Sequence, residues 1–220
     1  ALREAFCKLD SISPEAAVRH AQAAERGLVV LTDTGDSTFG GASGDSATIL
    51  AELVRQQVPM MALVPLVDPE AVAAAIAVGI GGTLTMEVGG KLDPNFGVPL
   101  SITARVAAIG GGRFEVVMLG FESFDMGRAV LLEIGAVRLV VSEKRGVCGN
   151  HPIVYEHFGI DVAEARMVVV KTASNWQFFQ PWISEVVRVD TPGATTSHLE
   201  DLPWRHLPRP IYPLDQREER

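Results

Sequence analysis

The sequence predicts an α/β fold, in which a parallel-type βαβ layer carries an inserted antiparallel β element. Short and wholly apolar segments such as residues 28–31 are typical of strands that are covered on both faces of a sheet. Alanine-rich segments with helix-start residues alternate with such strands in the first third of the chain, which favours parallel pairing. Between residues 83 and 120, alternating segments and glycines favour antiparallel strands.

The first predicted helix begins at Pro14. Ser13 is a favoured N-cap residue, and proline is favoured at the first helical position. Alanines continue the pattern to Arg26, and Gly27 is the residue type that most often ends a helix. A buried strand over residues 28–31 follows directly.

A second strand and two further helices complete the first third. After the loop over residues 33–44, apolar residues at helical spacing predict a helix that starts at Asp45. Residues 60–66 predict another buried strand. Asp68 then caps an alanine-rich helix, which ends at the glycines of residues 79–82.

The middle of the chain predicts antiparallel strands joined by glycine turns. Residues 83–88 and 100–106 alternate between apolar and polar side chains. The glycines at residues 110–112 predict a turn into a strand over residues 114–118. The apolar run at residues 129–132, like the next one at 137–141, fits either a helix or a strand.

The last third predicts a short helix over residues 161–165 and a strand over residues 167–170. From Thr191 onward the chain is rich in proline, so we expect irregular chain that wraps the surface. Residues 1–220 are expected to form one domain or two closely packed lobes, with the antiparallel element near residues 83–120.

Charge and cysteine content exclude several function classes. The formal net charge is −8 and the pI is about 5.1, without a basic stripe, so we expect no nucleic-acid partner. Charges, glycines or prolines interrupt every apolar run, so we expect no membrane partner. Cys7 and Cys148 form no paired motif, which makes the cytoplasm the default compartment.

The most informative segment is the acidic, glycine-rich loop over residues 33–45. It follows a buried strand, and in open α/β sheets ligands bind just beyond the carboxyl ends of strands. Its glycines let the backbone approach a ligand closely. The loop lacks the lysine of a phosphate loop, and Asp33, Asp36 and Asp45 would repel phosphate. Its charge suits a cation, an amine, or hydrogen-bond donors on a peptide.

A purely structural interpretation of this loop stands beside the functional one. Asp45 would then be a helix N-cap, Asp33 would close its strand with an Asx-turn, and the glycines would only shape the turn. For Asp45 alone we favour the N-cap. For the whole loop we favour a ligand-facing or interface role, because it is longer than most connections of this kind.

Lys171 ends the apolar strand of residues 167–170. At that position it could meet a substrate carboxylate or a neighbouring aspartate, or it could extend to solvent as a surface lysine. The sequence contains no self-sufficient catalytic set, and its histidines form no metal motif. These histidines are His20, His151, His157, His198 and His206.

Taken together, these residues resemble the MlrC family of metallopeptidases. Residues 33–45 resemble the family's Asp-x-x-Asp-Asn-Pro-Gly-Gly-Gly-x-x-Gly-Asp segment. Later segments follow in the family's order: Asp68-Pro69-Glu70, residues 79–82, Gly89-Gly90-Lys91, Gly97-Val98-Pro99, Gly159-Ile160-Asp161, Val169-Val170-Lys171, Thr191-Pro192-Gly193 and residues 209–215.

The resemblance implies the C-terminal domain of a zinc-dependent peptidase or amidohydrolase that acts on linearised microcystin or on other small peptides and amides. The zinc ligands of that family lie in an N-terminal domain, which would be absent from this chain. A start at Ala1 in what reads as the middle of a helix fits this expectation. The implied partners are the N-terminal domain and a small peptide or amide, with zinc bound only in the full-length protein.

The resemblance also implies a set of substrate-facing residues, although it implies no catalytic residue and no metal ligand in this chain. The substrate-facing set is Asp33, Asp36, Gly40, Gly41, Gly44, Asp45 and Lys171. Two stretches depart from the family pattern, namely Ser37-Thr38-Phe39 and Asn175-Trp176-Gln177. If these positions contact substrate in relatives, specificity here differs or activity has been lost.

Two other function classes remain open at this stage. The chain could be a stand-alone module that binds a small cationic or peptidic ligand without chemistry. It could also be a structural domain that supports the folding or dimerisation of its partner domain. Association of identical chains is left open as well, and the isolated chain is expected to be inactive.

Overall fold

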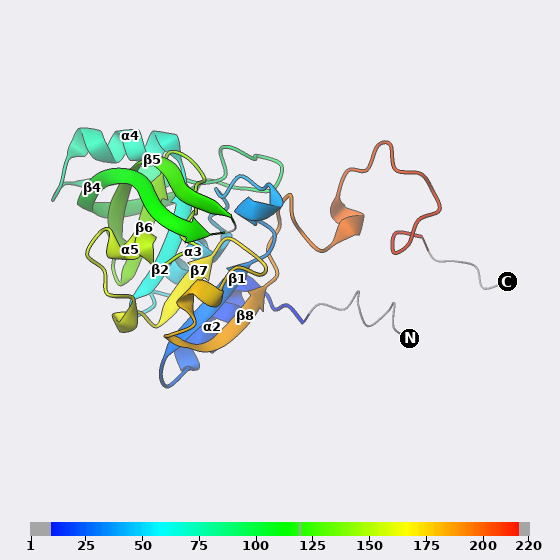
Figure 1. Ribbon diagram of the computed structural model, residues 1–220, viewed down its shortest axis with the longest axis horizontal. Helices are drawn as coiled ribbons and strands as arrows, with labels where there is room; N and C mark the ends of the chain where they lie inside the picture. The colour runs from blue at the N-terminus through cyan, green and yellow to red at the C-terminus, as the bar shows by residue number, and fades with distance from the viewer. Residues whose placement is uncertain (1–9, 119, 216–220) are drawn as a thin grey trace.

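The computed structural model describes residues 10–118 and 120–215, and its strands form one mixed sheet (Figure 1). The strand order is β3-β4-β5-β6-β2-β7-β1-β8. Five neighbouring strands are parallel: β6 (Val137–Ser142), β2 (Ala62–Val67), β7 (Met167–Val170), β1 (Leu28–Asp33) and β8 (Ile183–Val189). The predicted α/β fold class is therefore confirmed.

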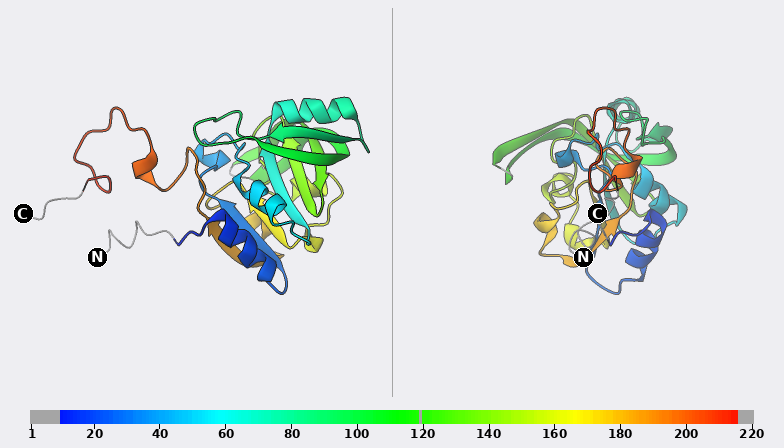
Figure 2. Two further views of the ribbon diagram at one scale, coloured as in Figure 1. Left: turned by 180° about the vertical axis from the view of Figure 1, so that it is seen from behind. Right: turned by 90° about the vertical axis from the view of Figure 1, so that its right-hand side faces the viewer.

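The antiparallel element extends this same sheet. It consists of β3 (Thr83–Val88), β4 (Leu100–Met118) and β5 (Phe121–Ile134), with β5 pairing antiparallel to β6. The apolar runs that fitted either a helix or a strand are strands in β5 and β6. The outer part of the β4–β5 hairpin projects beyond the rest of the sheet (Figure 2).

The glycines of residues 110–112 do not form the predicted turn. They lie inside the long strand β4, where Gly110 pairs with Ala129 and Gly111 with Arg128. For Gly112 the physical reason is close packing, because a Cβ there would lie 2.7 Å from the carbonyl oxygen of Gly127. Glycine here permits a close approach of two strands, a role that sequence alone does not distinguish from a turn.

Helices cover one face of the sheet (Figures 1 and 2). They are α2 (Pro14–Ala23), α3 (Thr48–Arg55) and α4 (Pro69–Val78). The opposite face is covered by shorter elements and the loops around them: α5 (Ile153–Glu156), η2 (Val162–Glu164) and η3 (Gln177–Phe179). Because β1 and β2 are buried along their whole length, their apolar sequences follow from coverage on both faces.

Two of the predicted helix starts and one of the predicted helix ends are confirmed, the end being that of α4 at Gly79. The Ser13 hydroxyl accepts a hydrogen bond from the Ala16 N–H, and the Asp68 carboxylate accepts one from Ala71, as N-caps do. However, α2 ends at Ala23 and not at Arg26. The second helix begins at Thr48 instead of Asp45, because the Asp45 carboxylate binds another loop, described below.

The chain beyond β8 has two parts. Residues 191–197 bind the carboxyl edge of the sheet, where Thr191 donates to Asp33 and Thr195 accepts from Ser37. Residues 198–215, which we call the arm, then extend away from the body (Figure 1) and include η4 (Leu199–Asp201). The proline-rich end was predicted to wrap the surface, and only its first part does so.

The helix-like pattern at Ala1 to Phe6 lies outside the described residues. Among the residues that are described, no helix has both the length and the apolar character needed to cross a bilayer.

His198 anchors the root of the arm, and its titration provides a test of this contact. Its Nε2 lies 3.0 Å from Asp190 Oδ1, and this hydrogen bond raises the pKa of His198 above 6.5. A raised pKa in the folded state stabilises the contact fully below about pH 6.5, and this contribution is lost as the pH rises through the folded pKa. We expect NMR titration to place the His198 midpoint above 6.5 and Asp190→Asn to lower it. An identical midpoint in both proteins would contradict the contact.

Candidate functional site

The candidate site lies at the carboxyl edge of the parallel strands, around the side chain of Lys171. Asp33 ends β1 and Lys171 follows β7, and these two strands are parallel neighbours. The Lys171 Nζ lies 3.0 Å from Asp33 Oδ2 and 2.9 Å from Asp36 Oδ2. It also donates to the carbonyl oxygen of Ser46 at 2.5 Å. Lys171 therefore pairs with neighbouring aspartates, as one of the interpretations of the sequence had it, and does not extend to solvent.

The ion cluster of Lys171, Asp33 and Asp36 is almost completely excluded from solvent. The exposed fractions of the three side chains are 1%, 0% and 3%. Burial alone would lower the pKa of Lys171, but the two carboxylates outweigh it and raise this pKa above its usual value. Lys171 is therefore a fixed cation, since lysines that act as bases or nucleophiles need a lowered pKa.

The two carboxylates shape the backbone of the loop. Asp36 accepts hydrogen bonds from the Gly44 N–H at 2.7 Å and from the Ser46 N–H at 2.8 Å. Asp33 accepts one from the Thr191 hydroxyl at 2.6 Å. Every carboxylate oxygen of the cluster thus has a donor, which is the condition for keeping a buried charge stable.

Residues that sequence analysis did not single out complete this arrangement. The Asn150 side chain donates to the Lys171 carbonyl oxygen at 3.3 Å and to the Thr38 hydroxyl at 3.3 Å. Cys148 is fully buried nearby, and burial raises its pKa to about 12, so its thiol is not a nucleophile at neutral pH. Neither residue carried a local motif, and only the long-range contacts reveal their position.

Asp45 has a different role from the predicted helix cap. Its Oδ2 accepts a hydrogen bond from the Leu92 N–H at 2.6 Å, and its carbonyl oxygen accepts one from the Gly90 N–H at 2.8 Å. The helix that follows begins only at Thr48 and has no side-chain cap. Asp45 therefore ties the 33–45 loop to a second loop of the carboxyl edge.

This second loop, residues 89–99, is held by another buried carboxylate as well. Asp68 accepts from the Gly89 N–H at 2.9 Å, and its Oδ2 lies 3.0 Å from Lys91 Nζ. Beyond these anchors the loop exposes apolar side chains, with Leu92 50% and Val98 82% exposed. The buried carboxylates of Asp45 and Asp68 thus hold a loop whose apolar side chains face solvent.

The predicted substrate-facing residues divide into two groups. Asp33, Asp36, Gly44, Asp45 and Lys171 are buried, whereas Gly40 and Gly41 are exposed. Gly41 has a φ of +105°, which favours glycine. The Arg145 side chain donates to the carbonyl oxygens of Gly41 and Ala42 at 3.3 and 3.2 Å. The exposed Gly40–Gly41 tip is accessible to a ligand, and the five buried residues support the loop that carries this tip. Substrate binding by these residues stays a prediction.

The two stretches that depart from the family pattern lie on different parts of this edge. In the first, Phe39 packs edge-on against Phe124 of β5, with ring centroids 6.5 Å apart, and Ser37 accepts from the Gly40 N–H. In the second, Asn175 is partly buried, and its N–H donates to the Thr172 hydroxyl at 3.2 Å. Neither stretch belongs to the ion cluster.

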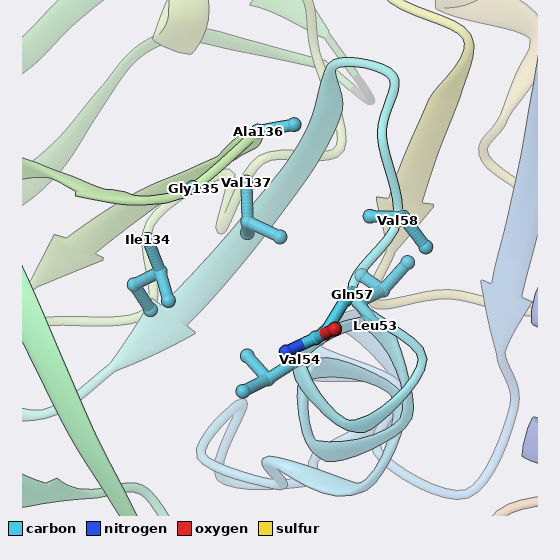
Figure 3. A pocket seen from close by; sticks show the side chains of 8 residues that line it. All are labelled: Leu53, Val54, Gln57, Val58, Ile134, Gly135, Ala136 and Val137. Carbon is cyan, nitrogen blue, oxygen red and sulfur yellow. The ribbon is translucent and has the colours of Figure 1, made fainter.

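The hollows of the surface differ in character. At the carboxyl edge, a hollow of about 10 Å³ lies beside Asp36, Asp45 and Asp93. A pocket of about 310 Å³ lies at the opposite edge, where α3 ends and β6 begins (Figure 3). Its side chains are apolar apart from Gln57, so it offers no group for acid–base chemistry.

The described residues do not provide a site that fits zinc. Among residues 10–118 and 120–215, no group of three or more His, Cys, Asp and Glu side chains is placed to hold a metal ion. Asp33 and Asp36 are two acidic residues of the predicted site, but the Lys171 ammonium group already pairs with both of them. A cation at that point would face a buried positive charge.

Removal of the Lys171 charge tests the ion cluster. Lys171→Met leaves two buried carboxylates without a counter-charge, and we expect a loss of about 3–5 kcal/mol in the free energy of unfolding. Urea denaturation measures this loss. Adding Asp33→Asn and Asp36→Asn should restore part of the stability, because no unpaired charge then remains.

Lys144→Met provides the matched control, because Lys144 pairs with Asp125 at 2.6 Å on the exposed surface. Its stability should equal that of the unchanged protein within error, since exposed ion pairs contribute little. Equal effects of Lys171→Met and Lys144→Met would refute the proposed role of the cluster.

Removal of the Asp45 carboxylate tests the tie between the two loops. Asp45→Ala leaves the Leu92 N–H without its acceptor, so we expect faster tryptic cleavage after Lys91 in the native protein. Asp161→Ala is the control, because Asp161 also accepts from a backbone N–H, that of Ala163, but away from this edge. Unchanged cleavage after Lys91 in the Asp45 variant would show that the loop is held by other contacts.

Comparisons with known proteins agree with the resemblance seen in the sequence. The family described as MlrC C-terminus matches residues 31–206. Microcystinase C from a Sphingomonas species is 29% identical over 159 residues, which cover 71% of this chain and 30% of that protein. The crystal structure of a candidate metallopeptidase from a Mesorhizobium species matches with a TM-score of 0.85 and 29% identity.

That structural match covers 97% of this chain and 43% of the Mesorhizobium chain. The chain therefore spans less than half the length of either relative. The family match includes the 33–45 loop, the 89–99 loop and Lys171. Since it covers most of the sequence, this chain belongs to the MlrC C-terminus family.

Proposed function

We propose that this chain is the C-terminal domain of a zinc-dependent peptidase or amidohydrolase, whose zinc centre lies in a part of the longer protein outside this chain. In this proposal the carboxyl-edge loops face that centre and help to bind a small peptide or amide. We also propose that the longer protein works in the cytoplasm, as expected for a chain without a disulfide framework.

The observation that carries this proposal is the likeness to two longer proteins. Microcystinase C and the candidate metallopeptidase each have more than half of their length outside the part that this chain matches. A domain that matches only one part of such proteins can contribute loops and a surface, while the remaining part supplies metal ligands. In the zinc peptidases generally, three protein ligands hold the ion and leave a position for water.

The geometry of the carboxyl edge supports this division of roles. The Lys171 cluster is buried and fully hydrogen-bonded, so it is suited to positioning and not to chemistry. Above it, the Gly40–Gly41 tip and Arg145 are exposed. Ligands of open α/β sheets bind at this edge, and Arg145 could pair with a substrate carboxylate.

The experiment uses the longer protein and this chain side by side. We expect the longer protein to hydrolyse members of a panel of small peptides, including linearised microcystin, to lose activity on chelation and to regain it with zinc. This chain alone should show no turnover and no tight zinc binding by calorimetry. A zinc-loaded longer protein without hydrolase activity, or tight zinc binding by this chain alone, would overturn the proposal.

Arg145 offers a sharper test within the longer protein. Because Arg145 supports the Gly40–Gly41 tip, Arg145→Ala should lower kcat/KM by about tenfold or more, as loss of positioning does. Arg138→Ala is the matched control, because Arg138 also donates to backbone carbonyl oxygens, those of Gly135 and Val137, but at the opposite edge of the sheet. The measurement is steady-state kinetics of both variants, after their melting temperatures have been shown to be equal. Equal kcat/KM values for the two variants would argue against a functional role of the Gly40–Gly41 tip.

A further inference from the structure

The arm, residues 198–215, has the composition of buried chain, although it is exposed. Seven of its 18 residues are Leu, Ile, Trp or Tyr, and four more are Pro. Within this range, all of which the structure describes, no residue is buried. Trp204 is 47% exposed and Ile211 is 39% exposed. Because large apolar groups are stabilised when they leave water, we expect a surface to cover this arm in the protein that carries it.

The arm has a defined local shape. The Trp204 Nε1–H donates to the Leu199 carbonyl oxygen at 2.6 Å. Near the end of the arm, the Arg209 guanidinium pairs with Asp215, whose carboxylate also accepts from the Ile211 N–H at 2.6 Å. Disordered tails are poor in large apolar residues, and local contacts of this kind lower the conformational entropy that is lost on binding. The arm is therefore suited to a specific contact.

The root of the arm is fixed to the 33–45 loop. The Thr195 hydroxyl donates to the Gly35 carbonyl oxygen at 2.8 Å. A Cβ on Gly193 would collide with this same carbonyl oxygen, so the two segments approach each other as only glycine permits. The arm and the 89–99 loop lie at the same end of the molecule (Figures 1 and 2). The arm thus leaves the body at the edge that, in the proposed function, faces the remainder of the longer protein.

The charge of the arm favours a protein surface as its partner. Its two Arg residues stand against three Asp and Glu residues, which gives a net charge of −1. Anionic membranes and nucleic acids attract clusters of basic side chains, and the arm has no such cluster. An apolar protein surface fits its composition better.

The solved relative contains a counterpart of the arm. Its match covers 97% of this chain, which leaves about 7 of the 220 residues unmatched. More than half of the arm therefore lies inside the match. Because the match covers only 43% of the Mesorhizobium chain, this counterpart occurs in a protein with more than half of its length elsewhere.

We propose that the arm packs its apolar side chains against the remainder of the longer protein and thereby holds that remainder over the carboxyl edge. This inference rests on the proposed function, which places the remainder at this edge. Since both parts then belong to one chain, their contact forms at an effective concentration on the order of millimolar. A second copy of the chain would have to compete with this local contact.

Hydrogen exchange, followed by mass spectrometry, tests the contact in the longer protein and in this chain alone. In the chain alone, we expect the amides of residues 202–214 to exchange as exposed chain does. In the longer protein they should exchange about 100-fold more slowly, because exchange then requires the packed contact to open. Residues 79–82 are the internal control, since they follow the far end of α4 and Ile80 is 67% exposed. Their exchange should be alike in both proteins.

A pair of variants of the longer protein sharpens this test. Trp204→Asp puts a charge into the contact, so the slow exchange of the arm should be lost. Ile80→Asp puts the same charge on another exposed apolar residue and should leave the arm slow. Slow exchange of the arm in this chain alone would show that the arm folds back on its own body, and would overturn the proposal. Fast exchange in the longer protein would do so too, as would slow exchange there that is lost on dilution from about 100 to about 1 µM, the sign of a second copy.

The exchange measurement does not depend on turnover, so the arm contact and the proposed function can fail separately. A slowly exchanging arm in a longer protein that neither binds zinc nor hydrolyses peptides would refute the proposed function alone. A rapidly exchanging arm in an active zinc peptidase would refute the arm contact alone.

Discussion

The charge of Lys171 lies in the interior of the protein, and two carboxylates make this possible. A buried ammonium group costs several kcal/mol unless counter-charges and hydrogen-bond acceptors surround it. Asp33, Asp36 and the Ser46 carbonyl oxygen provide them at 3.0, 2.9 and 2.5 Å. Since these three acceptors lie between the end of β1 and the start of α3, the position of a single side chain just after β7 fixes how the chain leaves β1.

The rest of the carboxyl edge depends on this loop. Once the backbone at Ser46 is fixed, Asp45 is placed to accept from Leu92 and thereby to hold the 89–99 loop. On the other side, the Thr191 hydroxyl reaches Asp33 and fixes the start of the segment that leads to the arm. Three segments that are far apart in sequence are therefore linked to one buried cluster, the 89–99 loop through Asp45 and the segment after β8 through Thr191.

Sequence patterns predicted the features that local physics controls. Apolar runs such as residues 28–31 predicted buried parallel strands, and Asp68 was correctly predicted as an N-cap. The pairing of Lys171 with aspartates was one of two interpretations, because the neighbours of a strand end depend on strand order. The N-cap role of Asp45 was predicted wrongly, since its carboxylate accepts from Leu92, a contact that local spacing does not reveal. The glycines at residues 110–112 were also misjudged, because a turn and a close strand contact require the same residue.

The most direct test of this account is native-state amide hydrogen exchange at Gly44 and Ser46, followed by NMR. Both N–H groups donate to Asp36, beneath which Lys171 is buried. If the cluster holds the loop, both amides exchange only through large-scale unfolding and are about as protected as those of β1 and β7. Exchange at the rate of an open surface loop, in a protein whose β1 and β7 amides stay protected, would contradict the account.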